Sequence, residues 1–245
     1  MFGEVPYKSY TFLGMGPGRG GIEHLNNTTI SFDGNTLKPE DSRKRMLSFI
    51  AHEYFHHYNV KRIRPYELGP FEYDRENRTN QLWVSEGLTV YYEYLLLRRA
   101  GLIDENDLLG LLAGDINAYE NDRERIFQSL QEASYYTWEE GPFGTRGGDA
   151  DSSISYYKKL QRGFTDAEFQ QACETVAGTH LTELFGYIYT TNGLDYEKYL
   201  GYAGLQLEPQ PSSREGSTEN STIKLTRKKE LDQLQEEIFQ SWQEK

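Results

Sequence analysis

The stretch Ser48–Pro65 reads SFIAHEYFHHYNVKRIRP and contains the motif H-E-x-x-H. Residues four apart stack on one face of a helix, so His52 and His56 can both reach one metal ion. Glu53 lies one step round the helix and points beside that ion rather than at it. This placement suits a general base that takes a proton from a metal-bound water without occupying a coordination position.

The histidine pair is not specific by itself. With five histidines in 245 residues, chance spacing produces this pattern in about one such sequence in a hundred. The alternative is a helix that carries two half-buried histidines and binds no metal. A third ligand separates the two interpretations.

The stretch Leu82–Glu93, LWVSEGLTVYYE, offers that ligand. Its apolar residues recur at helical spacing, and Gly101 follows as a C-terminal stop. A carboxylate on an otherwise buried helix face is costly unless it is paired or bound to a metal, so Glu86 is the natural third ligand. Two histidines and one glutamate leave a fourth zinc position open for water. Glu93 either holds a ligating histidine in its tautomer from the second shell or lies on a solvated helix face.

Local signals place the neighbouring elements. Strands are predicted at Tyr7–Leu13 and Thr28–Phe32, where β-branched and aromatic residues lie between turn residues. The helix with the histidines is predicted from about Pro39 to Tyr58, because proline and acids favour a helix N-terminus. Asp104 is predicted to be the N-cap of the helix that follows it in the sequence.

The run HEYFHHYNVKRIRP, followed by LWVSEG, resembles the glycyl aminopeptidase family of gluzincin zinc metallopeptidases (peptidase family sixty-one), distant relatives of aminopeptidase N. The resemblance covers roughly Phe2–Leu207 with one gap. It implies an α+β, mainly helical, thermolysin-like catalytic domain with a small N-terminal β layer. It also implies a zinc cofactor and removal of small N-terminal residues, glycine and alanine especially, from peptides.

The resemblance extends to the segment Gly20–His24, reading GGIEH. In relatives of aminopeptidase N a similar segment binds the substrate backbone, and its glutamate holds the free amino group. Gly20 and Gly21 would let the backbone approach a ligand closely, and Glu23 would bind the substrate's α-ammonium group. The alternative is a hairpin turn with an exposed acid.

The resemblance also implies a tyrosine that stabilises the negatively charged oxygen of the reaction intermediate. It would lie in the segment Ile154–Leu160, reading ISYYKKL. The relatives place such a tyrosine before x-Lys-Gly, and Tyr157 fits that position, with Tyr156 as the fallback. Its hydroxyl would donate a hydrogen bond to the oxygen that becomes negative when water adds to the peptide carbonyl. Because the chain has 19 tyrosines, only the resemblance separates this one from a structural residue.

The resemblance fails at Leu160, where the family has glycine followed by a long apolar helix. This chain continues through Gln161–Gly163 to a capping box, Thr165 with Glu168, which begins a helix that the family places much further on. We therefore expect an internal deletion near residue 160. Loss of a core helix exposes the apolar faces that it covers, so lower stability and impaired activity are expected.

Composition divides the chain into a catalytic domain at residues 1–205, a disordered linker at 206–222 and an amphipathic helical tail at 223–245. The linker is rich in Pro, Ser, Glu and Gly. The tail either binds a protein partner or a second copy, or docks on its own domain. The family's β-rich N-terminal domain and PDZ-like C-terminal domain are not recognised, so a truncated version is expected. The tail's apolar stripe is Leu231, Leu234, Ile238 and Trp242.

Bulk properties narrow the class of partner. A formal net charge of −12 argues against sequence-independent binding to nucleic acid or to an anionic membrane, since both need clustered cations. Cys173 is the only cysteine, so no internal disulfide forms. The sequence has no apolar run of membrane-spanning length and no signal-peptide layout at the N-terminus. This favours the cytoplasm for the chain as given and leaves an exported form open.

Together the patterns predict a zinc aminopeptidase that hydrolyses peptides through a metal-activated water. The rival interpretation is a catalytically impaired, truncated zinc-binding relative that acts as an interaction module. A third is a structural protein with incidental histidines, which predicts no stoichiometric zinc.

Overall fold

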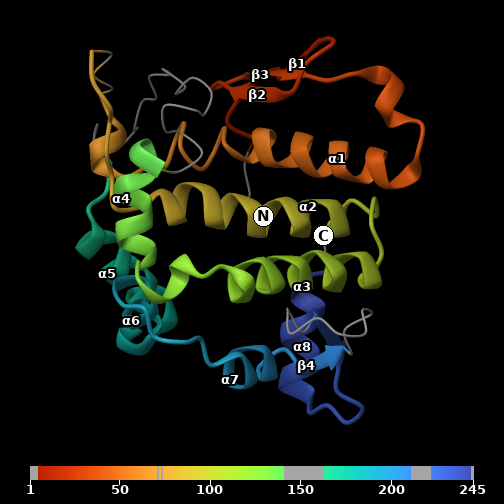
Figure 1. Ribbon diagram of the computed structural model, residues 1–245, viewed down its shortest axis with the longest axis vertical. Coiled ribbons are helices and arrows are strands. Elements are labelled where there is room, and N and C mark those ends of the chain that lie inside the picture. The colour runs from red at the N-terminus through yellow and green to blue at the C-terminus, as the bar shows by residue number, and fades with distance from the viewer. Residues whose placement is uncertain (1–4, 71, 73, 141–162, 211–221, 244–245) are drawn as a thin grey trace. The chain divides into compact units, whose positions relative to one another are not determined.

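The computed structural model describes residues 5–70, 72, 74–140, 163–210 and 222–243 (Figure 1). Within them the fold is α+β and mainly helical, as predicted, with a three-stranded and a two-stranded sheet. The first unit contains residues 1–93 and 128–190, and the second contains residues 94–127 and 191–245. Short 3₁₀ turns occupy Gly34–Leu37, Tyr66–Leu68 and Glu124–Ile126.

A small sheet forms the N-terminal β layer of the first unit. The strands β1 (Thr11–Met15), β2 (Gly20–Glu23) and β3 (Asn27–Ser31) lie in the order β1-β3-β2, with β1 parallel and β2 antiparallel to β3. The first predicted strand is displaced toward the C-terminus, because Tyr7 and Tyr10 pack as side chains against the neighbouring helix α1. The ring centroids of Tyr10 and Tyr54 lie 5.0 Å apart, and the sheet runs alongside α1 in Figure 1.

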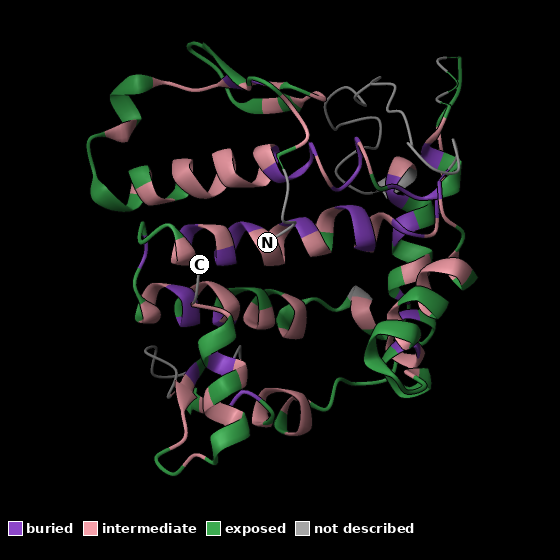
Figure 2. Cartoon of the chain, turned by 180° about the vertical axis from the view of Figure 1, so that it is seen from behind, coloured by how far each residue is buried: buried purple, intermediate pink, exposed green. Residues whose placement is uncertain are grey.

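Helix α1 (Glu40–Phe55) carries the histidine motif. Two acids, Glu40 and Asp41, lie in its first turn, where they favour the positive end of the helix dipole. The helix ends three residues before the predicted Tyr58, yet His56 keeps right-handed helical backbone angles, and its N–H donates to the carbonyl of His52 at 3.2 Å. The stacking of the two histidines on one face is therefore preserved. Figure 2 shows burial increasing toward this end of the helix.

The glutamate motif begins in a π-helical turn, η3 (Trp83–Gly87), which continues into α2 (Leu88–Arg99). A π-helix is wider than an α-helix, and such turns occur frequently at functional sites. The helix ends at Arg99, two residues before the predicted stop at Gly101, where φ is +70°. The motif segment thus forms a helix whose first turn departs from α geometry.

Three further helices complete the described part of the first unit: α4 (Leu130–Glu140), α5 (Asp166–Ala177) and α6 (Thr182–Tyr189). The backbone N–H of Trp83 donates to the hydroxyl of Ser134 on α4 at 3.2 Å. The ring centroid of Trp83 lies 5.7 Å from that of Phe169 on α5 and 6.4 Å from that of Phe185 on α6. These contacts fix the beginning of η3. The predicted capping box at the start of α5 is present.

The second unit combines helices with a hairpin-like sheet. It contains α3 (Glu105–Asn121), α7 (Tyr196–Gly201), β4 (Leu205–Gln210), β5 (Thr222–Arg227) and α8 (Gln233–Ser241). Asp104 caps α3 as predicted, through a capping box with Asp107. The buried core of this unit consists of Leu109, Ala113, Ala203, Leu205, Leu225 and Phe239.

The predicted disordered linker at 206–222 is wrong at both of its ends. Gln206–Gln210 belongs to β4 and Thr222 is the first residue of β5; the two strands pair antiparallel, with Gln210 opposite Thr222. The physical reason is burial of two apolar strand residues, Leu205 and Leu225, which are 1% and 2% exposed. Residues 211–221 of the predicted linker lie outside the described residues.

The predicted helical tail is also shorter than expected. Residues 222–227 form a strand, and the helix α8 begins after Asp232, whose side chain caps it. Phe239 is fully buried in the core of the second unit, whereas Leu234 of the predicted stripe is 62% exposed. The tail helix therefore docks on its own unit, as one of the two interpretations of the sequence proposed.

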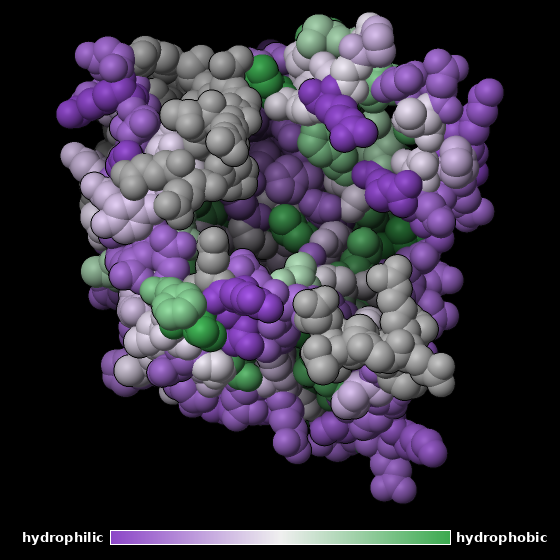
Figure 3. Space-filling model, in the orientation of Figure 1, coloured by the Kyte–Doolittle hydropathy of each residue, from purple (hydrophilic) through white to green (hydrophobic). Residues whose placement is uncertain are grey.

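The surface visible in Figure 3 is mostly hydrophilic, in agreement with the 26% of charged residues in the sequence. Hydrophilic side chains cover most of the face drawn in colour in Figure 3, with apolar side chains between them. Across the described ranges, no helix combines the length and the apolar composition that crossing a bilayer requires.

Candidate metal centre

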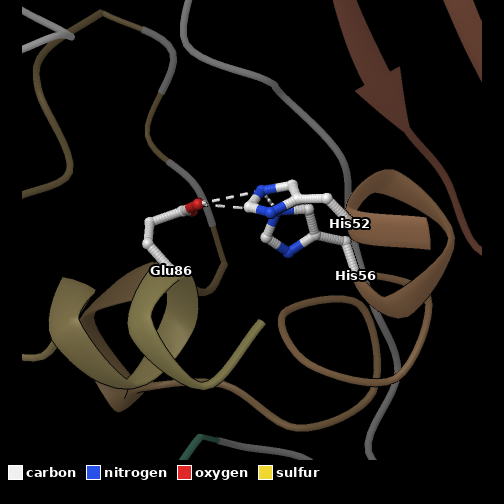
Figure 4. A group of neighbouring side chains, drawn as sticks. All are labelled: His52, His56 and Glu86. Atoms are coloured by element: carbon white, nitrogen blue, oxygen red, sulfur yellow. Dashed lines mark hydrogen bonds and ion pairs between the residues drawn. The ribbon is translucent and has the colours of Figure 1, made fainter. Parts of the chain in front are cut away.

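Three side chains converge at one point of the first unit (Figure 4). His52 and His56 project from the end of α1, and Glu86 projects toward them from η3. The two Nε2 atoms lie 3.1 Å apart, and Oε2 of Glu86 lies 3.4 Å from the first and 3.6 Å from the second. Ligands placed about 2.0–2.1 Å from a tetrahedral zinc ion lie about 3.3–3.4 Å from one another. The spacing of the three atoms is therefore close to that of a zinc site.

The hydrogen bonds on the far sides of the rings fix their tautomers. Nδ1 of His52 faces Oε2 of Glu93 at 2.9 Å, and Nδ1 of His56 faces the backbone carbonyl of Asn59 at 3.1 Å. An ionised carboxylate and a carbonyl only accept, so each Nδ1 must carry the hydrogen. When both rings are neutral, the lone pairs of the two Nε2 atoms face each other, and they repel unless a proton or a metal ion lies between them. The donor set, two neutral imidazoles and a carboxylate, fits a divalent cation such as zinc.

Glu93 supports His52 from the second shell of the site. The carboxylate is buried at 8% exposed, and its other oxygen accepts a hydrogen bond from the hydroxyl of Ser48. The structure therefore does not place Glu93 on a solvated helix face. A carboxylate behind a ligating imidazole orients the ring and increases its basicity.

The charges of the site shift the pKa values of its groups in the absence of metal. Burial lowers the pKa of His52, but hydrogen bonds to Glu86 and Glu93 outweigh it and raise the value to about 10. Burial likewise lowers the pKa of His56, while Glu86 raises it above the usual value. Burial raises the pKa of Glu86, but both histidines hold it well below its ordinary range. Without metal, His52 therefore keeps its proton at neutral pH and faces an ionised Glu86.

Glu53 lies beside this cluster in a state suited to proton transfer. Burial raises the pKa of its carboxyl to about 7, against the opposing charge of His56. Within the described residues, its buried Oε2 atom has no hydrogen-bond partner. A carboxylate with a pKa near neutrality and a free oxygen can take and return a proton.

One glycine of β2 lies against Glu53. A Cβ atom at Gly21 would fall 2.6 Å from Cδ of Glu53, so a side chain at this position would displace the Glu53 carboxylate. Gly20 adopts a φ of +107°, which other residues rarely adopt. The structure thus brings Gly21 against Glu53, whereas nothing lies within 4 Å of a Cβ atom placed at Gly20; that these two glycines bind substrate stays a prediction.

Glu23 is also near the site, but it already has a partner. Its Oε1 lies 3.0 Å from Nζ of Lys61, a lysine only 1% exposed. Its charge contributes to the raised pKa of Glu53. The side chain is therefore not the exposed acid of a hairpin turn, and among the described residues its Oε2 atom forms no ion pair.

Tyr157, Tyr156 and the break at Leu160 lie outside the described residues. Two residues that the sequence analysis did not assign to the site, Asn59 and Lys61, contact its members. The only sequence signal for them is their position just after the second histidine, which does not reveal their partners.

Comparisons of the sequence and of the fold with known proteins identify similar proteins. Residues 45–161 match the model of the M61 glycyl aminopeptidase family. Three solved chains match the structure. One is the crystal structure of an aminopeptidase N family protein from Idiomarina loihiensis, with 26% sequence identity and a TM-score of 0.69; the match covers 84% of this chain and 43% of that chain. Comparison with curated proteins finds no match.

The fold is thus similar to that of an aminopeptidase N family protein, and it brings together a histidine–glutamate cluster that could hold a metal ion. The family match, which includes His52, Glu53, His56 and Glu86, and the structural likeness support the M61 glycyl aminopeptidase family of metallopeptidases, so the predicted resemblance is confirmed. The matched region is shorter than the Phe2–Leu207 of the sequence resemblance and ends one residue after Leu160. The chain spans less than half of the solved relative.

Proposed function

We propose that the chain is a zinc-dependent aminopeptidase that hydrolyses peptides with a small N-terminal residue, glycine or alanine. The observation that carries the proposal is the convergence of three ligand atoms: the two Nε2 atoms lie 3.1 Å apart, and Oε2 of Glu86 lies within 3.6 Å of each. The spacing is that of ligands around one zinc ion, which would take the place of the proton that the cluster holds without metal.

The roles of the side chains follow from their positions. Bound zinc would polarise the peptide carbonyl and acidify a water molecule. Glu53, whose buried Oε2 has no partner among the described residues, takes the proton from that water and delivers it to the leaving amine. Both transfers use the same carboxylate, which is neutral after the first and charged again after the second.

The proposed binding of the peptide substrate involves residues of strand β2. Because β2 is an edge strand and Gly21 lies against Glu53, an extended peptide that pairs with β2 would pass close to the base. Glu23 would hold the substrate's α-ammonium through the oxygen that Lys61 does not occupy. The preference for glycine or alanine is proposed from the family alone, and Tyr157 is proposed on the same basis as the hydrogen-bond donor to the oxyanion.

Metal content and peptide hydrolysis test the proposal together. The purified chain should bind one zinc ion and release the chromogenic amine from glycyl and alanyl amides. Glu53→Gln should keep the zinc and lose turnover, whereas His52→Ala should lose both. Zinc binding without hydrolysis would favour the interaction module, and the absence of stoichiometric zinc would overturn the metal centre itself.

A further inference from the structure

Asn59 makes an unusual set of hydrogen bonds between the two ligand-bearing segments. The residue lies three positions after His56 and is 6% exposed. Its Nδ2 atom lies 2.8 Å from the carbonyl oxygen of Val84, 2.9 Å from that of Ser85 and 3.0 Å from Oγ1 of Thr89. Carbonyl oxygens only accept, so the amide NH₂ group must face them. Its two hydrogens are thus shared among three acceptors.

The backbone of Asn59 contacts the other side of the site. Its carbonyl oxygen accepts a hydrogen bond from Nδ1 of His56 at 3.1 Å. One residue therefore orients a proposed ligand through its main chain and holds the segment that carries the third ligand through its side chain. Val84 and Ser85 immediately precede Glu86 in η3.

Asn59 donates hydrogen bonds to carbonyl groups inside the π-helical turn η3. A π-helical turn is rare, and its hydrogen bonds differ in register from those of the α-helix that follows. The carbonyl of Ser85 also accepts from Oγ1 of Thr89 at 2.6 Å, so side chains of Asn59 and Thr89 both stabilise this one group. Releasing these carbonyls would let the turn revert toward α geometry, which would rotate Glu86 about the helix axis.

We propose that Asn59 is a positioning residue that sets the distance between Glu86 and the histidine pair. The inference rests on the proposed metal centre and assigns no chemical step to Asn59 itself. Its effect acts through the carbonyls of Val84 and Ser85 and should appear as a change in metal affinity.

Asn59→Asp tests this role with almost no change in volume. The substitution replaces the NH₂ group by an acceptor oxygen that faces two carbonyls, while the backbone carbonyl that orients His56 is unchanged. The zinc affinity of the full chain, measured by competition with a chromogenic chelator, should fall about 10–100-fold, as for other groups that orient metal ligands. Asn59→Ser, smaller and uncharged, provides a second variant should the aspartate prevent folding, and it should lower the affinity by a smaller factor.

Asn117 offers a matched control in the second unit. Its Nδ2 also donates to two carbonyl oxygens, those of Ala113 and Ile223, each at 2.7 Å. Asn117→Asp removes the same kind of hydrogen bonds from a residue that contacts no member of the metal cluster. This variant should unfold more easily but bind zinc as tightly as the unchanged chain. An equal loss of affinity in both variants would show general destabilisation and overturn the proposal.

A double-substitution cycle with Glu86→Ala separates positioning from general packing. If Asn59 acts through Glu86, Asn59→Asp should weaken zinc binding in the unchanged chain and cost no further affinity once Glu86 is alanine. Additive losses would overturn the inference while leaving the metal centre intact. Failure of the unchanged chain to bind zinc would instead remove both this inference and the proposed function.

Discussion

Oε2 of Glu93 lies 2.9 Å from Nδ1 of His52, on the side of the ring away from Glu86. The imidazole of His52 is thereby held between two carboxylates, one behind it and one across the metal position. The same ring can hold a proton or a metal ion at Nε2, and Glu93 stabilises the positive charge in either state.

The first prediction concerns this second carboxylate. Glu93→Ala removes the acceptor that fixes the tautomer of His52, so zinc affinity should fall about 10–100-fold. Ser48→Ala should have a smaller effect, because Glu93 still contacts His52 when its second oxygen loses the hydroxyl. Competition with a chelator measures both variants. An unchanged affinity in Glu93→Ala would show that the hydrogen bond does not orient the ligand.

The second prediction is a pH dependence of the metal-free protein. Because the pKa of His52 is raised from 6.5 to about 10, protonated His52 stabilises the folded state. That contribution is fully present below pH 6.5 and is lost as the pH rises through about 10. Urea unfolding of protein treated with a chelator should therefore show a free energy of unfolding that falls across this range.

Two comparisons check the origin of the pH effect. Glu93→Gln removes one of the charges that raise the pKa of His52 and should narrow the range over which stability falls. Zinc affinity should show the opposite trend and increase with pH, because the metal must displace the proton from Nε2. A free energy of unfolding that rises between pH 6.5 and 10 would contradict the raised pKa of His52 in the folded state.

The third prediction concerns the contact between β2 and the base. In Gly21→Ala, the new methyl carbon would meet Cδ of Glu53 at 2.6 Å, so the carboxylate must move. A displacement of about 1 Å at a catalytic group can cost about 100-fold in rate, so hydrolysis should fall by about that factor. Zinc content should stay unchanged, since the ligands are not displaced directly.

Gly34→Ala is the control for the glycine substitution, because nothing lies within 4 Å of a Cβ atom placed there. Its activity should equal that of the unchanged chain. Full activity in Gly21→Ala would show that Glu53 moves without consequence and would count against its role as the base.

The convergence of His52, His56 and Glu86 was predictable in part, because the signal of the histidine pair is local geometry. His52 and His56 are one helical turn apart, so their convergence follows from helix periodicity, even though α1 ends at Phe55. Glu86 was predicted from the cost of a carboxylate on a buried helix face, but its side chain is 40% exposed, so its convergence with the histidines and not its burial supports the assignment. The π-helical turn that carries it was not, since spacing alone does not distinguish a π turn from an α turn.

Residues whose roles depend on distant segments escaped prediction. Asn59 contacts a carbonyl 25 positions along the chain, and Lys61 pairs with Glu23 across the fold. The β4–β5 pair was missed for a related reason. The polar composition of 206–222 suggests disorder, whereas the burial of Leu205 against a strand beyond that stretch depends on long-range pairing. Pairing across an intervening segment leaves no periodic signal of its own.

The last prediction tests the position of the C-terminal helix. Phe239 on α8 is fully buried in the core of the second unit, so Phe239→Ala should lower the free energy of unfolding by about 3–5 kcal/mol. Leu234→Ala on the same helix should change it by less than about 0.5 kcal/mol, because Leu234 is 62% exposed. Denaturant titration followed by circular dichroism compares the two variants. Similar small effects in both would mean that α8 is not part of this core and is available to a partner.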